Sequence, residues 1–214
     1  MVYMPSEHGH MLPRPLSIFR TDREKGELSL LFEIKGRGTK LLSGADQGSS
    51  WILLGPLGTG FPPPPPKSLL VAGGIGIAPL AFLAETAAHP VTLVYGARTA
   101  GQLICPSADL DLPGIKLVSV TEDGSRGESG TAIDICRRLL AEADAIFACG
   151  PNEMLSAVGL LARRAGSPAW VSMEERMACG IGACLGCAVK TKEGYKRVCR
   201  DGPVFPAEEV FVDD

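Results

Sequence analysis

Residues 68–79 read Ser-Leu-Leu-Val-Ala-Gly-Gly-Ile-Gly-Ile-Ala-Pro, and this stretch decides the fold. Its apolar start is typical of a strand that is buried on both faces of a parallel sheet. The glycines at 73, 74 and 76 predict a turn, and Pro79 suits the first turn of a helix that continues to about residue 88. This order predicts an α/β nucleotide-binding unit, although the third glycine of the dinucleotide fingerprint is missing.

The alternation of strand and helix continues downstream. Strands are predicted at 91–95, 116–121, 145–149 and 170–173, and helices near 132–141 and 152–165. Such a pattern predicts a doubly wound parallel sheet, whose ligands bind at the carboxyl ends of the strands. The loops at 73–78, 121–125 and 149–154 are therefore candidate nucleotide-binding segments. Cys149 has two interpretations, a small buried strand residue or a side chain against a nicotinamide ring.

The first 61 residues have a different, strand-rich pattern. Strands are predicted at 27–34 and 51–54, and a short helical segment begins after Lys-Gly-Arg-Gly-Thr at 35–39. Two glycines around a cation, followed by threonine, suit a pyrophosphate cradle, and a turn with Thr39 as the N-cap is the alternative. Five prolines at 62–66 predict a stiff polyproline II connector between domains, with a ligand for a proline-binding module as the alternative.

Four of the seven cysteines lie near the C-terminus with the spacing C-x4-C-x2-C-x11-C, at Cys179, Cys184, Cys187 and Cys199. This is the ligand spacing of plant-type [2Fe–2S] clusters. Glycines at 180, 182 and 186 allow the loop to wrap closely around a cluster. A four-cysteine zinc site is the first alternative, but it usually contains two CxxC pairs and only one is present. Disulfides are disfavoured by the odd cysteine count and by the absence of a signal-peptide pattern.

Composition limits the classes of function. The chain has 214 residues, of which 45% are hydrophobic, and a net charge of −3. These values predict a globular protein with a proper core and argue against nucleic acid as a partner. No apolar run is long enough for a membrane span, so we expect no membrane partner and a cytoplasmic location.

Together the motifs resemble one family. They are R-P-x-S at 14–17, G-x-G-T at 36–39, G-G-I-G-I-A-P at 73–79, E-D-G-S at 122–125, C-G-P-x-x-M at 149–154, E-R-M-x-C-G-I-G-A-C-x-x-C at 175–187 and V-C-x-D-G-P at 198–203. Their order is similar to that in the electron transfer subunit of class 1B dihydroorotate dehydrogenase, a ferredoxin reductase-like flavoprotein, over residues 12–205. The resemblance implies FAD, a [2Fe–2S] cluster and NAD as cofactors, and a separate FMN-containing dihydroorotate dehydrogenase catalytic subunit as the partner, in a heterotetramer of two plus two.

The resemblance also implies a role for each matching position. FAD would be bound by Arg14, Pro15, Leu16, Ser17, Leu31, Phe32, Glu33, Gly38 and Thr39, and the nicotinamide nucleotide by Gly73, Gly74, Gly76, Ile77, Ala78, Pro79, Glu122, Asp123, Gly124, Cys149, Gly150 and Pro151. Ser17 and Cys149 would lie at the reacting rings, and the four cysteines would ligate iron. No acidic residue follows the strand at 91–95, where Arg98 stands, so the preference for NAD is implied by the resemblance alone.

The implied architecture is α/β plus β. Residues 1–61 would form a flavin-binding antiparallel β-barrel, 62–66 a linker, 67–169 the NAD-binding α/β domain and 170–214 the cluster module. Only 13 residues precede Arg14, so the barrel is expected to be N-terminally short and to retain FAD less firmly.

The implied function is electron transfer between NAD and the partner's FMN, in pyrimidine biosynthesis. A flavin can join the two-electron chemistry of NAD to the one-electron chemistry of a cluster. Apolar residues in the cluster loop (Ile181, Ala183, Leu185) with charged neighbours (Arg197, Arg200, Asp201) suit a docking face, and packing within the chain is the alternative. The alternative functions are a diaphorase subunit of a hydrogenase or transhydrogenase-like complex, in which aspartate often replaces Cys179, and a non-redox zinc module.

Overall fold

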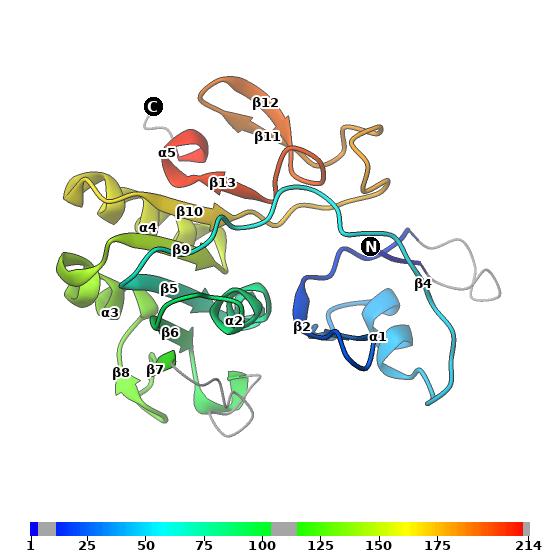
Figure 1. The fold of residues 1–214 in the computed structure, drawn as a ribbon, viewed down its shortest axis with the longest axis horizontal. Coiled ribbons are helices and arrows are strands. Elements are labelled where there is room, and N and C mark those ends of the chain that lie inside the picture. Colours follow the sequence, from blue (N-terminus) through cyan, green and yellow to red (C-terminus); the bar gives the residue numbers. More distant parts are fainter. Residues whose placement is uncertain (4–11, 104–114, 212–214) are drawn as a thin grey trace.

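A seven-stranded sheet forms the centre of the larger half of the molecule (Figure 1). The structure is a computed structural model that describes residues 1–3, 12–103 and 115–211. The strands are β5 (Ser68–Gly73), β6 (Val91–Ala97), β7 (Ile115–Thr121), β8 (Glu128–Ser129), β9 (Ala145–Cys149), β10 (Ala169–Ser172) and β13 (Val204–Pro206), in the order β13-β10-β9-β5-β6-β7-β8. All neighbouring strands are parallel except β13, which pairs antiparallel with β10. The predicted parallel sheet is therefore confirmed.

Helices cover both faces of this sheet. Helix α2 (Ile77–Glu85) lies on one face, and α3 (Ala132–Leu139) and α4 (Asn152–Ala165) lie on the other. The alternation of side chains along β5 explains this arrangement, because Leu69 and Val71 join the core under α3 and α4 whereas Leu70 and Ala72 join the core under α2. Single-turn 3₁₀ helices at Gly74–Gly76, Ala100–Gln102 and Leu140–Glu142 complete the helical elements of this half.

The N-terminal half contains two separate antiparallel ladders among the described residues. Strand β1 (Val2–Tyr3) pairs with β4 (Ile52–Leu53), and β2 (Ile18–Asp22) pairs with β3 (Glu27–Leu30). Helix α1 (Arg37–Ser43) follows β3. The strand predicted at 27–34 ends at Leu30 and the strand predicted at 51–54 has only two residues, because the segments that follow them, at 31–33 and 53–58, line a cleft instead of continuing a ladder.

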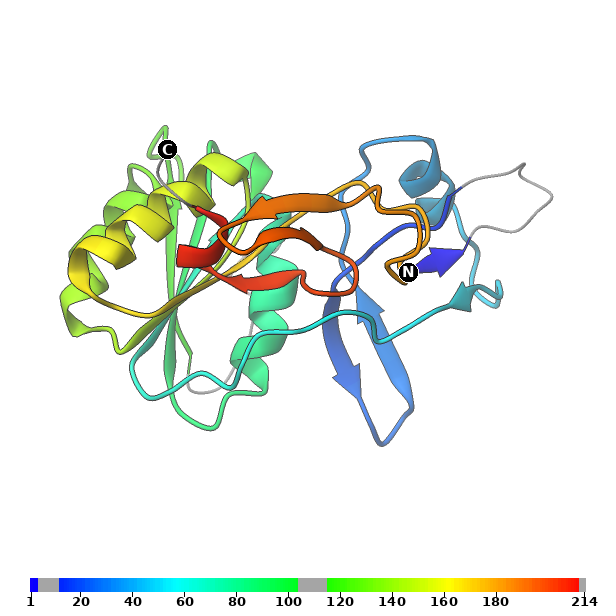
Figure 2. The same ribbon diagram turned by 90° about the horizontal axis from the view of Figure 1, so that it is seen from above.

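The proline run at 62–66 lies along the molecule, as Figure 2 shows, and is not an isolated tether. Pro64 is buried, and the Phe61 ring meets the Phe147 ring edge to face at 5.9 Å. Phe19 of β2 and Leu31 pack against the core under α2, so the two halves share apolar contacts. The run therefore packs against the protein at Pro64, whereas Pro63 and Pro66 are exposed.

After β10 the chain leaves the sheet and returns to it. A hairpin of β11 (Ala188–Thr191) and β12 (Gly194–Arg197) projects from the sheet, and β13 and α5 (Ala207–Val210) bring the chain back (Figures 1 and 2). Strands β10 and β13 lie within the segment expected to be the cluster module, yet both belong to the large sheet. Within the described residues, no helix has both the length and the apolar character needed to cross a membrane.

Candidate functional site

A cleft of about 2460 Å³ separates the N-terminal ladders from the large sheet. This volume exceeds that of a pocket for a single drug-sized ligand, so the cleft has room for more than one cofactor. Most predicted FAD and nucleotide residues line it together: Arg14, Pro15, Leu16, Ser17, Leu31, Phe32, Glu33, Thr39, Gly73, Gly74, Gly76, Ala78, Pro79, Glu122, Cys149, Gly150 and Pro151. Segments from all three predicted modules thus meet at one surface.

The nucleotide side of the cleft lies where the strand order reverses. Strand β5 has β6 on one side and β9 on the other, so chain progression diverges at β5 and leaves a crevice at its carboxyl end. Ala72 is paired with Cys149, which places the loops 73–78 and 149–154 side by side. Gly76 packs directly on the Cys149 carbonyl group, where a Cβ atom would collide with backbone. The absence of a side chain at Gly76 therefore allows the two loops to contact each other, a role separate from the predicted contact with the nucleotide.

Four predicted cofactor residues do not line the cleft: Gly38, Ile77, Asp123 and Gly124. Ile77 is fully buried in the core under α2. Asp123 accepts hydrogen bonds from the Ser125 hydroxyl (2.6 Å) and backbone N–H (3.0 Å), and these bonds lower the pKa of its carboxyl group. Asp123 and Gly124, whose φ is +70°, therefore shape the turn after β7, and Glu122 is the residue of this loop that reaches the cleft.

Arg14 connects the FAD side of the cleft to the start of α1. Its backbone pairs with Val2, and its guanidinium donates to the Leu12 carbonyl group. The guanidinium lies over Gly38, where an added Cβ atom would be 2.8 Å from Nη2. Gly38 does not line the cleft, but it leaves the space that the guanidinium of Arg14, a cleft residue, occupies.

Thr39 stabilises the turn that leads into α1. Its hydroxyl oxygen accepts from the N–H groups of Lys35 (3.0 Å) and Gly36 (3.2 Å), and the hydroxyl donates to the Gly36 carbonyl group. Thr39 is not the N-cap predicted in the alternative, because Gly36 is the N-cap of α1 and Thr39 is the third residue of the helix. The turn faces the cleft.

The FAD side of the cleft is also apolar. Leu12, Leu28, Leu53 and Leu54 are exposed leucines of the N-terminal half, and all four line the cleft. Exposed apolar side chains that gather in one concave surface are typical of a ligand site.

Cys149 lies at the floor of the cleft as a neutral thiol. Burial raises its pKa to about 12, and a hydrogen bond with Ser172 only partly opposes that shift. A thiol that stays protonated is a poor nucleophile. The geometry therefore supports a packing contact with a bound ring and not covalent catalysis.

The segment after β10 contributes cleft residues that the sequence analysis did not assign. They are Met173, Glu174, Glu175, Arg176 and Met177, together with Phe61 and Met154. The sequence did contain a signal for residues 173–177. They lie between the last parallel strand and the first cysteine of the predicted cluster motif, so the segment must start at the carboxyl edge of the sheet, where the cleft lies.

The β11–β12 hairpin brings two of the four cluster cysteines together. Cys187 immediately precedes β11 and Cys199 follows β12, so strand pairing places them side by side. The Cys199 N–H lies 3.4 Å from the Cys187 sulfur, and Val198 donates to the Cys187 carbonyl group. Both cysteines are buried, and Cys199 also borders the cleft.

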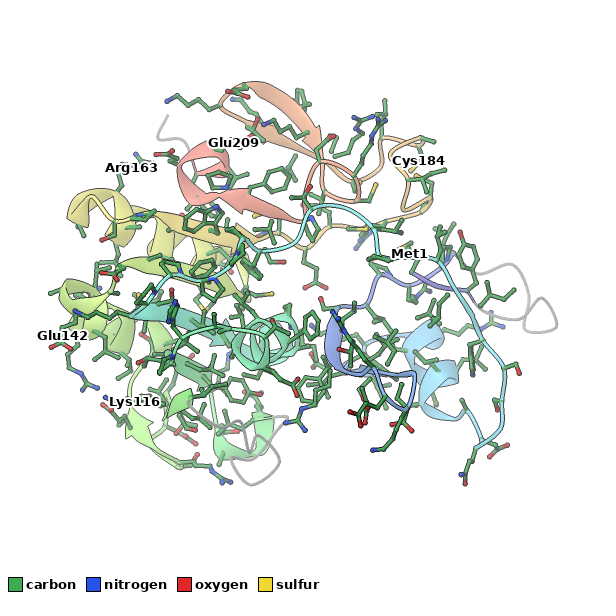
Figure 3. The ribbon with its side chains drawn as sticks, viewed as in Figure 1. Met1, Lys116, Glu142, Arg163, Cys184 and Glu209 are labelled. Atoms are coloured by element: carbon green, nitrogen blue, oxygen red, sulfur yellow. The ribbon has the colours of Figure 1, made fainter. Side chains whose placement is uncertain are left out.

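The other two cysteines, Cys179 and Cys184, share a glycine-rich loop. The Cys179 sulfur accepts hydrogen bonds from the N–H groups of Cys184, Ile181 and Ala183 and from the Cys184 thiol, which lower its pKa to about 6. The Gly182 N–H points to Cys199 instead. Four consecutive amides thus face the sulfurs, as the site of an anionic cluster requires. Figure 3 shows Cys184 in the loop that projects away from the sheet.

The arrangement of the four sulfurs bears on which metal group could bind. Among the described residues, no group of three or more His, Cys, Asp or Glu side chains converges in a way that could hold a metal ion. The thiols form two pairs, Cys179 with Cys184 and Cys187 with Cys199. This pairing is compatible with a [2Fe–2S] cluster, in which each of two irons has two cysteine ligands.

Comparison with known proteins agrees with this geometry. Residues 174–211 match the family model for the iron-sulfur cluster binding domain of dihydroorotate dehydrogenase B. The electron transfer subunit of dihydroorotate dehydrogenase B (NAD(+)) from Desulforamulus reducens is 40% identical over 211 residues, which cover 94% of this chain and 80% of the relative. Its counterpart from Geobacillus kaustophilus is 39% identical, with 94% of this chain and 81% of the relative covered.

Solved structures show the same fold. The structure of an NADH-dependent reduced ferredoxin-NADP oxidoreductase matches with a TM-score of 0.81 and 32% identity, over 93% of this chain and 74% of that chain. A ferredoxin reductase of carbazole 1,9a-dioxygenase matches with a TM-score of 0.61 and 22% identity, over 73% of this chain and 53% of that chain, and supports the fold alone. These similarities confirm the family that the motifs predict. The chain belongs to the family of electron transfer subunits of dihydroorotate dehydrogenase B.

Proposed function

We propose that this chain transfers electrons between NAD and the catalytic subunit of a dihydroorotate dehydrogenase, through FAD in the cleft and a [2Fe–2S] cluster at Cys179, Cys184, Cys187 and Cys199. One observation carries the proposal. Cys199 lines the same cleft as Arg14–Ser17 on the FAD side and Gly73–Gly76 on the nucleotide side. In this assignment the proposed cluster site and both proposed cofactor sites border one cleft.

On the FAD side, Arg14 would hold the phosphates, because a guanidinium suits oxyanions, and the turn at Thr39 would border them. Leu16, Ser17 and the segment 31–33 would support the flavin. This assignment makes residues 1–61 the flavin domain and the two antiparallel ladders its barrel part. The domain limits at 62–66 and 169 belong to the same proposal.

On the nucleotide side, the loops 73–78 and 149–151 would receive the nicotinamide half of NAD, and Glu122 would reach its ribose. Cys149, kept neutral by burial, would pack against the ring and exclude water without forming a bond. When bound, FAD exchanges two electrons with NAD and single electrons with the cluster. The chain's own residues orient the partners of that exchange.

The partner would be an FMN-containing subunit that oxidises dihydroorotate, in an assembly of two plus two chains in the cytoplasm. Cys184 is exposed at the cluster loop, beside exposed Ile181 and Leu185. The Cys179–Cys184 pair would thus face the partner, and the buried Cys187–Cys199 pair would face the cleft. Transfer to a different NADH-linked complex is a second candidate, favoured by the likeness to the oxidoreductase of bifurcating type.

The experiment is cofactor analysis of the chain purified anaerobically with its catalytic subunit. We expect about two irons and two acid-labile sulfides per chain, with visible absorption from iron–sulfide charge transfer, and FAD in stoichiometric amount. Cys184→Ser should lose that absorption and keep FAD. Stoichiometric zinc without labile sulfide in the wild-type chain would contradict the proposal.

A further inference from the structure

The cleft continues beyond β5, past the loops proposed for the nicotinamide half of NAD. Residues at the carboxyl ends of β6 and β7 and at the start of α3 line this distal end, among them Gly96, Arg98, Gln102, Glu122, Thr131 and Ile133. Of these residues, only Glu122 has a proposed role so far. Neighbouring strands lie about 4.8 Å apart, so in the order β5-β6-β7 the end of β7 is about 10 Å from the end of β5. The distal end is therefore where the adenosine half of the nucleotide would lie.

Two oppositely charged residues follow the neighbouring strands at this end. The parallel ladder of β6 and β7 ends at the pair of Ala97 and Thr121. Arg98 and Glu122 are the next residues on the two strands, and both are exposed and line the cleft. Within the described part of the chain, neither of their side chains forms an ion pair or a hydrogen bond with another protein group. Both charges are thus available to a ligand.

Backbone hydrogen bonds hold the two loops together. The Glu122 N–H donates to the Ala97 carbonyl group (3.1 Å), and the Asp123 N–H donates to the Arg98 carbonyl group (3.2 Å). The Asp123 carboxylate is occupied, because it accepts hydrogen bonds from the Ser125 hydroxyl (2.6 Å) and N–H (3.0 Å). Glu122 is therefore the carboxylate of this loop that a ligand in the cleft can reach, and its backbone is fixed.

The order of the charges along the sheet matches the order of groups along a dinucleotide. When the nicotinamide lies at the end of β5, the pyrophosphate comes next and the adenosine ribose follows it. Strand β6 lies between β5 and β7, so Arg98 would meet the pyrophosphate and Glu122 would meet the ribose. A guanidinium pairs well with phosphate oxygens, and a carboxylate accepts hydrogen bonds from ribose hydroxyl groups.

We propose that Glu122 accepts a hydrogen bond from the 2′-hydroxyl group of the adenosine ribose and thereby selects NAD over NADP, while Arg98 binds the pyrophosphate that both nucleotides share. NADP carries a phosphate at this 2′ position, which would face the carboxylate and be repelled by it. In the usual dinucleotide-binding unit the acidic residue comes about 20 residues after the glycine turn, a place that Arg98 occupies here. The inference rests on the proposed function and names its specificity-determining residue.

The test is the binding of two adenosine fragments, ADP-ribose and 2′-phospho-ADP-ribose, measured by titration calorimetry on the FAD-loaded complex of this chain with its catalytic subunit. We expect the wild-type chain to prefer ADP-ribose. Glu122→Gln removes the charge and keeps the shape, and the preference should fall by about tenfold or more, the effect of losing one hydrogen bond to a charged group. Glu122→Asp should retain a preference for ADP-ribose. Arg98→Gln is the matched variant of opposite charge, and it should weaken the binding of both fragments by the same factor.

Kinetics give a second measurement, the ratio of kcat/KM for NADH and NADPH in dye reduction. Glu122→Gln should change this ratio through KM and leave kcat unchanged, because Glu122 lies away from the nicotinamide end of the cleft. An unchanged fragment preference in Glu122→Gln overturns the proposal, as does wild-type protein that binds both fragments equally. It is also overturned if Arg98→Gln weakens only the 2′-phosphorylated fragment. A wild-type complex that holds FAD but oxidises neither NADH nor NADPH would instead overturn the proposed function, and this inference with it.

Discussion

Gly38 lies beneath the guanidinium of Arg14, where a larger residue would push that group away from the cleft. We predict that Gly38→Ala weakens FAD binding by about 1.5–3 kcal/mol, the range for a hydrogen bond to a charged group, or roughly 10- to 100-fold. The measurement is the FAD dissociation constant from flavin fluorescence, with Arg14→Ala as the matched variant. Gly44→Ala at the end of α1 is the control, because its added Cβ atom would lie no closer than 3.6 Å to its neighbours and Gly44 does not line the cleft. Undiminished FAD affinity in Gly38→Ala would show that Arg14 does not hold the phosphates.

Single residues also mark the limit of prediction from sequence. The iron-sulfur binding segment could be recognised from the spacing of its four cysteines, which is a ligand spacing of [2Fe–2S] clusters, and the assignment of each cysteine as a ligand stays a prediction. Gly38 could be named as a site residue, but its action through Arg14 depends on a contact between segments 24 residues apart in the chain, as the sequence numbers show. Asp123 was assigned to the nucleotide site through the resemblance, whereas in the structure its carboxyl group accepts hydrogen bonds from the N–H and hydroxyl groups of Ser125.

At the scale of elements, the contact between the loops after β5 and β9 holds the nucleotide side together. Gly76 packs on the Cys149 carbonyl group, so a valine at 76 must separate the two loops. We predict that Gly76→Val lowers the free energy of unfolding by about 1–3 kcal/mol, as overpacking does, and reduces NADH-driven dye reduction with it. Denaturant unfolding checks this, and Gly60→Ala, with open space around it, is the control. If stability is retained while only NADH kinetics change, Gly76 contacts the nucleotide and not the loop.

Five of the seven strands of the large sheet, β5, β6, β7, β9 and β10, could be predicted because each has a local apolar pattern, whereas β8 and β13 were not predicted. The apolar run of β5 and the glycine turn after it can be interpreted without knowing any distant contact. The parallel sheet and the crevice at its carboxyl end could therefore be predicted from them. The cluster hairpin and the return of β13 to β10 could not be predicted, because β11 and β12 have four residues each and alternate weakly. Their pairing depends on contacts around Cys187 and Phe205, which join segments distant in the chain.

At the scale of the whole molecule, the loop that carries Cys179 and Cys184 would be the exposed end of the proposed electron path. Ile181 and Leu185 are 57% and 63% exposed, and Leu185 has a φ of +59°, a conformation unfavourable for leucine. An exposed apolar side chain on a strained backbone suggests a functional constraint. We predict that Leu185→Glu abolishes co-purification with the catalytic subunit and leaves cluster absorption and NADH-driven dye reduction in place.

Leu185→Gly is the matched variant for that docking prediction. It removes the apolar side chain and also relieves the backbone conformation, so it should weaken the complex without disturbing the cluster. Full co-purification and coupled activity in Leu185→Glu, with the cluster present, would place the docking surface elsewhere on the molecule.

The central claim is that the cleft and the cluster form one electron path between NAD and a dihydroorotate-oxidising partner. The most direct measurement is the anaerobic formation of NADH from NAD and dihydroorotate by the catalytic subunit, with and without this chain. The account predicts that NADH forms only when the chain is present with FAD and an intact cluster, and that Cys184→Ser abolishes it. NADH formation at the wild-type rate by the Cys184→Ser chain, or none at all from a chain loaded with both cofactors and bound to the catalytic subunit, would contradict it.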